Sequence, residues 1–529
     1  MKKMEEMFER QLVRSRRNTL GDILLRTRER VPKKLAFSYK EEQVTFSELD
    51  ERVNQTARAF LQDGIKKGDM ITVMSKNSLD FVVVTFALAR IGAVMIPINY
   101  MLTTEDIQYI LEHAEVKGLI ASKEFITVLD KIHSDFISFR YVMDVASDEN
   151  CAKRWLPLAK VRQNQSVNFV EASIDDEDLA QVLYTSGTES RPKGVMLTHK
   201  SIISEYVSCI VDGKMDKNDV LVHALPFYHS AQLHVFLGPS VYVGASGIIL
   251  EGASPEIILE AIEKNQANQL FCPPTVWIAL LRHADFDKRD LSTLEKCYYG
   301  AAIMPIEILK ELSRKLPHAR FWNFYGQTEV APLATALQPE DQLRKLGSAG
   351  KPTLNVQTKI VDENGQEVPR GEIGEIVHRT PHVMVGYLHD PDKTAEAFQH
   401  GWFHSGDLGM MDEEGYIKVI DRKKDMINTG GVNVSSREVE EVIYQINGVS
   451  EVAVIGIADA YWIEAVTAVI VCKEAAVITK EEVLAFCKER LSAFKVPKYV
   501  YFIDTLPKNP SGKVLKRSLR KQFGAMQEN

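Results

Sequence analysis

The segment YTSGTESRPKG, residues 184–194, says most about how this chain folds and what it binds. It follows the apolar run LAQVL and gathers glycine and hydroxyl side chains just before Lys193 and Gly194. Such residues let a loop wrap an anion with backbone N–H and side-chain O–H donors. The spacing differs from the phosphate loop G-x-x-x-x-G-K-[ST], because Pro192 precedes the lysine and a glycine follows it. A strand is expected next, before Thr198 begins a helix. We therefore predict a phosphate-type loop of another kind.

The overall composition is that of an ordinary globular protein of two or three domains, since the chain has 529 residues. Its net charge of −8 argues against a nucleic-acid partner, because binding to phosphate backbones depends on clustered Lys and Arg. The six cysteines form no C-x-x-C pair, which indicates reduced thiols rather than disulfides or a zinc site. The most apolar stretch, residues 81–98, contains Arg90 and is typical of a buried helix and strand. We expect a cytoplasmic protein without a transmembrane segment.

Strand and helix patterns alternate through the first 150 residues. A helix is predicted over 46–64, with Ser47 and Asp50 as its capping box and Gly64 as its stop signal. Strands are predicted at 69–75, 93–99 and 117–122, with a helix over 79–90 between the first two. Thr103 and Asp106 cap the following helix. This alternation predicts an α/β sheet covered by helices.

The pattern of the sequence changes between residues 371 and 422 from alternating helices and strands to short strands. DENG and DEEG turns flank these strands, and the segment is therefore predicted to form a β-rich subdomain. After the charged joint RKKDMINTGG, about 100 residues carry their own mixture of helices and strands. We predict an α/β + α+β fold with a large N-terminal domain (1–421), a hinge (422–425) and a small, mobile C-terminal α+β domain (426–529).

The quoted loop resembles the signature loop of the adenylate-forming superfamily, which comprises acyl- and aryl-CoA synthetases, peptide-synthetase adenylation domains and luciferases. The resemblance implies that the loop holds the β- and γ-phosphates of ATP through Thr185, Ser186, Gly187, Thr188 and Lys193. The sequence departs from the family at Glu189 and Ser190, where Thr and Gly are usual. A carboxylate beside a triphosphate is unfavourable unless it points away or shares a Mg²⁺.

Further motifs of the family follow in its order along the chain. They are LPFYHS (225–230), YYGAAIMP (298–305), NFYGQTE (323–329), GWFHSGDLG (401–409), DRKKD (421–425) and NPSGKVLKR (509–517). Each alone has an ordinary structural interpretation, but their shared order makes coincidence implausible. His223 and His234 lie outside the motifs and are interpreted as structural.

For ATP, the resemblance implies that Tyr325 stacks on adenine and that Asp407 and Arg422 reach the ribose. The small residues Gly300, Ala301, Ala302 and Gly326 would let the backbone approach the nucleotide. Thr328 would contact the α-phosphate, Glu329 would hold Mg²⁺, and Lys513 would be the catalytic lysine.

For the other substrates, the resemblance places His229 and Gly300 at the acyl pocket, Lys424 at the hinge, and Gly430 and Gly431 beside the pantetheine arm of CoA. The CoA motif departs from the family pattern at Val432 and Ser436. The implied reaction consumes ATP with Mg²⁺: a small-molecule carboxylic acid attacks the α-phosphorus to form acyl-AMP, and CoA then takes the acyl group. The attacking carboxylate is already ionised near neutral pH, so no general base is required.

Sequence features also bear on the choice of acid and of acceptor. Amino-acid adenylation domains carry an aspartate where this chain has Tyr228, which argues against an amino acid. The short connection from Glu329 to GSAGKP (347–352) leaves no room for the insertion of fatty acyl-AMP ligases, which favours CoA as acceptor. The apolar segments YVGASGIILEG and PPTVWIALL favour a medium- or long-chain fatty acid. An aryl- or dicarboxylate-CoA ligase, a carrier-protein ligase and a non-catalytic nucleotide-binding regulator are the alternatives, and a homodimer is a candidate oligomeric state.

Overall fold

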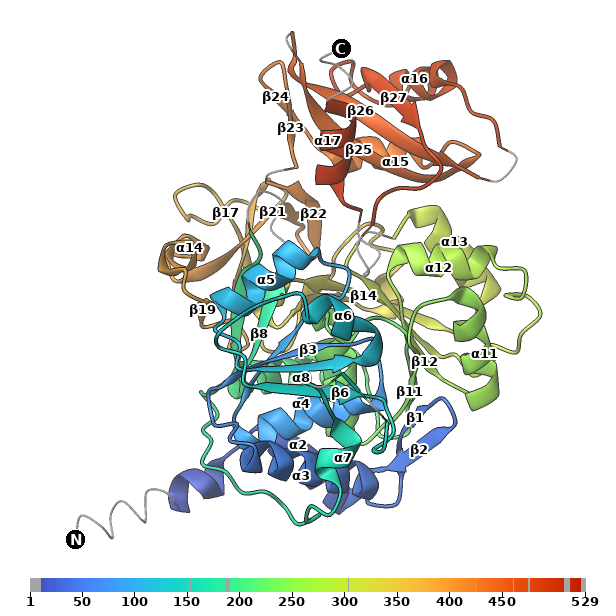
Figure 1. Cartoon of the computed structure of the whole chain (residues 1–529). Helices are drawn as coiled ribbons and strands as arrows, with labels where there is room; N and C mark the ends of the chain where they lie inside the picture. Colours follow the sequence, from blue (N-terminus) through green and yellow to red (C-terminus); the bar gives the residue numbers. More distant parts are fainter. Residues whose placement is uncertain are drawn as a thin grey trace.

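The computed structural model of the chain describes residues 11–149, 151–152, 154–185, 191–302, 304–423, 425–459, 461–473, 476–508 and 514–524. Over these ranges the named strands form four sheets. Three of them lie in the larger body of the molecule, and the fourth stands apart at the top of Figure 1 with the helices around it. The predicted combination of a large α/β domain and a smaller α+β domain is confirmed.

The sheet that carries the quoted loop has the strand order β19-β9-β8-β4-β3-β5-β6-β7. Its central strands are parallel, and β9 and β19 add to its edge in antiparallel orientation. The strands are β3 (Met70–Met74), β4 (Val94–Pro97), β5 (Gly118–Ser122), β6 (Phe139–Met143), β7 (Leu156–Pro157), β8 (Leu179–Thr185), β9 (Lys193–Thr198) and β19 (Gly386–Tyr387). Helices α3 (Phe46–Gln62), α4 (Leu79–Ile91), α5 (Thr104–His113), α6 (Ile126–Leu129) and α7 (Leu158–Arg162) alternate with them, as the sequence predicts.

Helix α3 begins at Phe46, as predicted, but its N-cap lies two residues before the predicted Ser47. Thr45 is the N-cap: its hydroxyl accepts from Glu48 N at 3.3 Å, and the Glu48 carboxylate accepts from Thr45 N at 2.8 Å. The predicted cap at Ser47 and Asp50 is wrong, because β2 runs directly into the helix and leaves Ser47 inside the first turn. Asp50 instead forms a buried ion pair with Arg90 at 2.8 Å.

The second sheet has the order β16-β15-β14-β13-β12-β10-β11-β1-β2. Its strands are β1 (Leu35–Tyr39), β2 (Glu42–Thr45), β10 (Val220–His223), β11 (Ser246–Ile249), β12 (Gln269–Phe271), β13 (Lys296–Gly300), β14 (Arg320–Gly326), β15 (Leu333–Leu337) and β16 (Lys351–Pro352). The helices of this part are α2 (Leu20–Arg30), α8 (His199–Asp212), α9 (Ser230–Gln232), α10 (Gly238–Val243), α11 (Pro255–Asn265), α12 (Pro274–Arg282) and α13 (Ile306–Lys315), with a π-helical turn at Leu233–Leu237. Thr198 caps α8, as predicted.

The third sheet is the predicted β-rich subdomain, with β17 (Gln357–Val361), β18 (Gly374–Arg379), β20 (Phe398–Gln399), β21 (Trp402–Met411) and β22 (Ile417–Arg422), and with α14 (Pro391–Ala397) beside it. The fourth sheet contains β23 (Ile427–Thr429), β24 (Val432–Val434), β25 (Val449–Asp459), β26 (Ile463–Cys472) and β27 (Tyr499–Phe502). It packs with α15 (Ser436–Ile443), α16 (Lys480–Lys488) and α17 (Lys516–Gly524) around its own apolar core. The boundaries at 421 and 426 stay a proposal, which this separate core supports.

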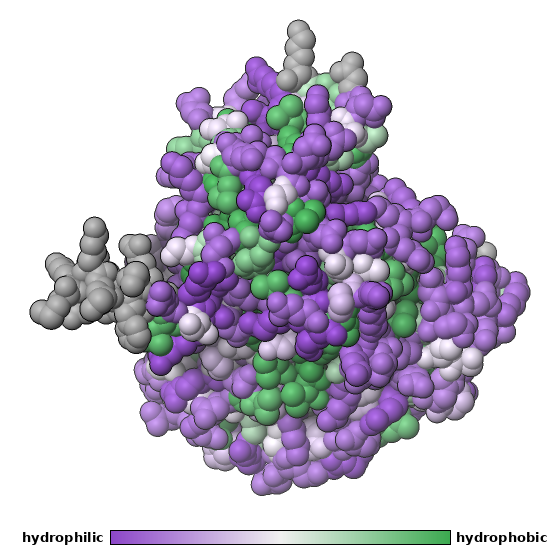
Figure 2. Space-filling view, turned by 90° about the horizontal axis from the view of Figure 1, so that it is seen from below, coloured by the Kyte–Doolittle hydropathy of each residue, from purple (hydrophilic) through white to green (hydrophobic). Residues whose placement is uncertain are grey.

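Apolar side chains are concentrated inside these layers. The apolar stretch 81–98 forms the buried helix α4 and strand β4, as predicted. No helix in the described part of the chain is long and apolar enough to cross a membrane. On the face shown in Figure 2 hydrophilic residues dominate, and hydrophobic residues gather in patches toward its middle.

Candidate active site

Three predicted nucleotide residues meet where β14, β21 and β22 come together. The Tyr325 hydroxyl donates to Asp407 Oδ2 at 2.7 Å, and Arg422 Nε lies 3.1 Å from Asp407 Oδ1. Asp407 and Arg422 face each other in the antiparallel register of β21 and β22. The Asp407 carboxylate therefore joins Tyr325, which lies 82 positions before it in the chain, to Arg422 on the neighbouring strand.

The electrostatics of this cluster fix which atom carries the proton. Burial, and after it the negative charge of Asp407, raises the pKa of Tyr325 well above its ordinary value. The phenol therefore stays protonated and donates, while the Asp407 carboxylate accepts. A carboxylate has about four acceptor sites, so Asp407 keeps capacity for further hydroxyl donors such as those of a ribose.

The predicted phosphate and metal residues follow directly after β14, on the turn Thr328–Val330. The Thr328 hydroxyl lies 3.1 Å from the Ser230 hydroxyl at the start of α9. Glu329 Oε1 accepts from the Tyr387 hydroxyl at 3.0 Å, and the Lys193 ammonium lies 4.8 Å from the centre of the Tyr387 ring. Lys193 and Glu329, which the sequence predicts for phosphate and Mg²⁺, thus both contact one tyrosine.

The quoted loop is anchored at both described ends. Thr185 and Lys193 face each other in the antiparallel pairing of β8 and β9, and they are the pair nearest to the loop. The Tyr184 hydroxyl bonds to His113 Nδ1 at 2.7 Å, and Arg191 stacks over the Tyr109 ring at 5.0 Å. The predicted ATP ligands Ser186, Gly187 and Thr188, and the unusual Glu189 and Ser190, lie outside the described residues.

The glycines of the site are required by the packing of neighbouring backbone. A Cβ on Gly300 would lie 2.4 Å from the Phe324 carbonyl oxygen, and one on Gly326 would lie 1.8 Å from the Pro332 carbonyl oxygen. Both glycines are therefore required by close approach of neighbouring backbone, whatever they do for a ligand. Ala301 has φ of 61°, and both Ala301 and Ala302 are exposed beyond the end of β13.

His229 lies at the N-terminus of α9 and lines a small pocket, where Nδ1 accepts from Ala231 N at 3.2 Å. The pocket has a volume of about 10 Å³. It is lined by Leu225, Pro226, His229, Ala231, Gln232, Phe271 and Ala301. His229 and Ala301, predicted for the acyl and adenine sides, therefore border the same space.

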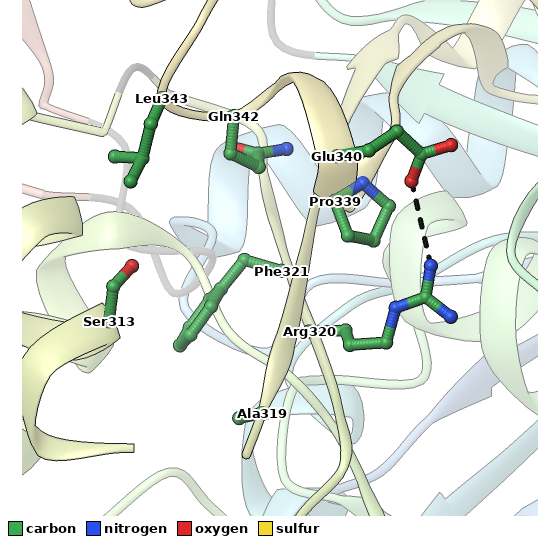
Figure 3. Close-up of a pocket in the computed structure, with 8 residues that line it drawn as sticks. All are labelled: Ser313, Ala319, Arg320, Phe321, Pro339, Glu340, Gln342 and Leu343. Carbon is green, nitrogen blue, oxygen red and sulfur yellow. Dashed lines mark ion pairs between the residues drawn. The ribbon is translucent and has the colours of Figure 1, made fainter. Parts of the chain in front are cut away.

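A larger pocket lies elsewhere, between α13 and the turn Pro339–Asp341 (Figure 3). Arg320 and Glu340 form an ion pair of 3.5 Å at one side of it. None of its lining residues is a predicted site residue. The chemistry is better supported at the smaller pocket, where the motif residues converge.

The remaining predicted residues belong to the C-terminal part. Lys424 and Lys513 lie outside the described residues. Gly430 and Gly431 are exposed in the hairpin between β23 and β24, with φ of 60° and 86°. Gly430 N donates to the Trp462 carbonyl oxygen at 2.6 Å, which ties this hairpin to the start of β26.

A Mg²⁺ site fits the residues present only in part. No group of three His, Cys, Asp or Glu side chains that could hold a metal occurs in the described ranges. Mg²⁺ is, however, usually bound through one or two carboxylates together with substrate phosphates. The single carboxylate of Glu329, next to the phosphate loop, meets that requirement.

Three residues of the site were not predicted from the sequence. Ser230 and Gln232 lie in or just after the LPFYHS motif, where only His229 was predicted as a site residue. Tyr387 lies in VMVGYLHD, which carries no recognised motif. Its role becomes visible only when β19 pairs with β9 beside the loop.

Comparisons with known proteins show the family to which the chain belongs. The model of the AMP-binding enzyme family matches residues 24–388, and that of the AMP-binding enzyme C-terminal domain matches residues 438–513. A feruloyl-CoA synthase of Amycolatopsis sp is 33% identical over 482 residues, covering 91% of this chain and 94% of that protein. A long-chain-fatty-acid–CoA ligase of Escherichia coli O6:H1 is 31% identical over 529 residues, covering 93% and 92%.

Among solved structures, ATP-bound MatB from Rhodopseudomonas palustris superposes with a TM-score of 0.87 at 31% identity, over 96% of this chain and 99% of that one. Family and fold agree over nearly the whole length. The chain belongs to the adenylate-forming family of AMP-binding enzymes and is one of its AMP-forming acid–CoA ligases.

Proposed function

We propose that this ligase works in two steps through a bound acyl-adenylate. The acid's carboxylate oxygen attacks the α-phosphorus of ATP and pyrophosphate leaves; the CoA thiolate then attacks the acyl carbonyl and AMP leaves. The observation that carries the proposal is the convergence of Tyr325, Asp407 and Arg422 next to Thr328 and Glu329. We assign the Tyr325 ring to adenine, Asp407 and Arg422 to the ribose, and Thr328 and Glu329 to the phosphates and their Mg²⁺.

The residues act mainly by position and charge. Asp407 accepts from the ribose hydroxyls while Arg422 and Tyr325 hold its carboxylate in place. Lys193 neutralises charge on the departing phosphates, Thr185 and the loop supply hydrogen-bond donors, and Thr328 donates to the α-phosphate. Bound through Glu329, Mg²⁺ would stabilise the charge that develops on the leaving pyrophosphate.

We further propose that residues 422–425 are a hinge and that Lys513 acts only in the first step. A lysine is suited to bridging two anions, since its ammonium is a compact charge on a long stem. Contacts across the joint support a defined arrangement of the two parts: Ser436 N donates to Asp421 at 2.7 Å and Arg520 pairs with Asp425 at 2.7 Å. A homodimer and a cytoplasmic location stay predictions, which light scattering and fractionation would check.

The acid that we propose has an apolar body. Leu225, Phe271 and Ala301 line the pocket behind His229, and they suit a fatty chain. The similarity to both a fatty-acid ligase and a feruloyl-CoA synthase keeps medium- or long-chain fatty acids as the first proposal and aryl acids as the second.

The test is pyrophosphate release from ATP and Mg²⁺ with fatty, aryl and dicarboxylic acids, with and without CoA. We expect sustained release only with CoA, with AMP and acyl-CoA as products. Lys513→Ala is expected to abolish release yet still convert supplied acyl-AMP and CoA into thioester. Equal loss of both half-reactions would contradict the role of Lys513, and tight ATP binding without release for any acid would contradict the proposed reaction.

A further inference from the structure

Asp421, near the end of β22, contacts the N-terminus of α15 across the proposed hinge. Asp421 is 3% exposed, and Ser436, the first residue of α15, is 0% exposed. Asp421 Oδ2 accepts from Ser436 N at 2.7 Å and from the Ser436 hydroxyl at 2.8 Å. Strand β22 belongs to the larger body of the molecule, whereas α15 belongs to the domain at the top of Figure 1. One buried carboxylate therefore joins the two parts on either side of residues 422–425.

The start of α17 is tied to the same serine. Lys516, the first residue of α17, donates through its ammonium to the Ser436 hydroxyl at 2.6 Å. Lys516 Nζ also lies 2.8 Å from Glu440 Oε1 on α15. The Ser436 hydroxyl thus accepts from Lys516 and donates to Asp421, which a hydroxyl can do at the same time. A continuous series of bonds therefore runs from β22 through α15 to the start of α17.

These bonds depend on the type of residue at position 436, where the motif departs from the family pattern. The first N–H group of an α-helix has no acceptor within the helix, and in α15 Asp421 supplies one. A proline at position 436 would lack both this N–H and the hydroxyl, although proline is favoured as the first residue of a helix. The helix itself therefore does not require the contacts with Asp421.

Separating Ser436 from Asp421 is costly because the carboxylate is buried. Among the described residues, every donor to Asp421 Oδ2 comes from the C-terminal side of the hinge, namely Ser436 N, the Ser436 hydroxyl and the Ser435 hydroxyl at 3.4 Å. A buried charge that loses its donors is unfavourable. Any rotation about residues 422–425 that carries α15 away from β22 removes these donors together. The bonds therefore favour the described arrangement over others that a hinge allows.

The described arrangement fits the first step of the proposed reaction. Lys513, which is proposed to act in that step, precedes Lys516 by three positions, and three residues span at most about 10 Å. Holding Lys516 against α15 and β22 therefore limits where Lys513 can lie. Strand β22 also carries Arg422, which pairs with Asp407 at the proposed ribose site. The start of α17 is thus fixed relative to the strand that binds the nucleotide.

We propose that Ser436 and Lys516 are positioning residues for acyl-AMP formation, which hold the C-terminal domain against Asp421 in the arrangement that serves the first step. They act through the location of Lys513. Formation of the thioester then requires these bonds to break, because the same hinge carries α15 and α17 away from β22. This inference rests on the proposed two-step function and names the contacts that select its first arrangement.

The test measures the two half-reactions separately, with the acid that gives the fastest pyrophosphate release. Acyl-AMP formation is followed as single-turnover pyrophosphate release without CoA, and transfer is followed as thioester formation from supplied acyl-AMP and CoA. Ser436→Pro and Lys516→Met should each lower the rate of acyl-AMP formation about tenfold or more, because each removes hydrogen bonds to or from a charged group. Thioester formation should be unchanged or faster. Ser436→Ala, which keeps the N–H donor, should lose less than Ser436→Pro.

Lys480→Pro is the matched control, because it places a proline at the first position of the exposed start of α16, and both half-reactions should stay unchanged. If Ser436→Pro lowers Tm more than Lys480→Pro does, Ser436→Ala and Lys516→Met decide the test. Equal loss of both half-reactions, unchanged acyl-AMP formation, or a loss confined to thioester formation would overturn the inference. Acyl-AMP formation that survives in Lys513→Ala would instead be a failure of the proposed function.

Discussion

Replacing Tyr387 by phenylalanine separates two contacts that meet at one side chain. The Tyr387 hydroxyl donates to Glu329 Oε1 at 3.0 Å, and the Lys193 ammonium lies 4.8 Å from the ring centre. Phenylalanine keeps the ring and therefore keeps the contact with Lys193. The variant loses only the donor that orients the proposed Mg²⁺ carboxylate.

The size of the effect follows from the type of bond. A hydrogen bond to a charged group contributes about 1.5–3 kcal/mol, and every 1.4 kcal/mol is a factor of ten. Tyr387 is 8% exposed, so water cannot readily replace the lost donor. We expect kcat/KM for ATP to fall by about tenfold or more when Mg²⁺ is limiting.

The assay is pyrophosphate release at saturating acid and CoA, with Mg²⁺ varied from well below to well above its half-saturating concentration. The expected signature is an increase in the Mg²⁺ concentration needed for half-maximal rate, with most of the activity recovered at high Mg²⁺. Tyr387→Ala, which also removes the ring beside Lys193, should not recover in this way. A Tyr387→Phe defect of equal size at every Mg²⁺ concentration, or no defect, would refute the role given to Glu329.

Other contacts give further expected outcomes. Tyr184→Phe and His113→Ala each remove the 2.7 Å hydrogen bond between the Tyr184 hydroxyl and His113 Nδ1 at the base of the phosphate loop. Steady-state kinetics should show KM for ATP raised about fivefold and KM for the acid unchanged, whereas equal changes in both KM values would contradict a loop-specific role. Gly300→Ala places a Cβ 2.4 Å from the Phe324 carbonyl oxygen, and the free energy of unfolding measured with denaturant should fall by about 1–3 kcal/mol. An unchanged denaturation midpoint would show that β13 and β14 can move apart at no cost in stability. Burial lowers the pKa of His199 to about 4, so the contribution of the neutral ring to stability is complete above the ordinary pKa of 6.5 and is lost as the pH falls toward 4. The decrease of Tm from pH 7 to pH 4 should therefore be smaller in His199→Asn than in the wild type, and equal decreases would contradict this.

The elements of the fold were largely predictable because their signals are local. Thr103 and Thr198 cap the helices that the sequence predicts, and the apolar stretch 81–98 is a buried helix and strand. The helix α3 begins at Phe46 as predicted, but its N-cap was misplaced because two overlapping capping patterns occur within residues 45–50. Only the end of β2 decides between them, and that end is fixed by pairing with a different strand.

The site was predictable where the motif residues contact one another. Tyr325, Asp407 and Arg422 were expected at one nucleotide and are joined by direct contacts. The glycines were interpreted through a ligand, whereas the atoms that come closest to Gly300 and Gly326 are carbonyls of the neighbouring strand and turn. Sequence patterns show that a backbone approach is needed but not which backbone approaches.

The missed residue Tyr387 shows how the two ends of the proposed ATP site are joined. The segment 384–388 bonds to two parts at once: Met384 N donates to the Glu329 carbonyl at 2.8 Å, and Leu388 N donates to the Gly194 carbonyl at 2.8 Å. Between these bonds Tyr387 faces Val195 in the pairing of β19 with β9. The turn that carries Thr328 and Glu329 is therefore fixed to the strand that follows the phosphate loop. Because backbone bonds make this connection, side-chain variants at 387 should alter metal and phosphate binding without moving Tyr325, Asp407 or Arg422.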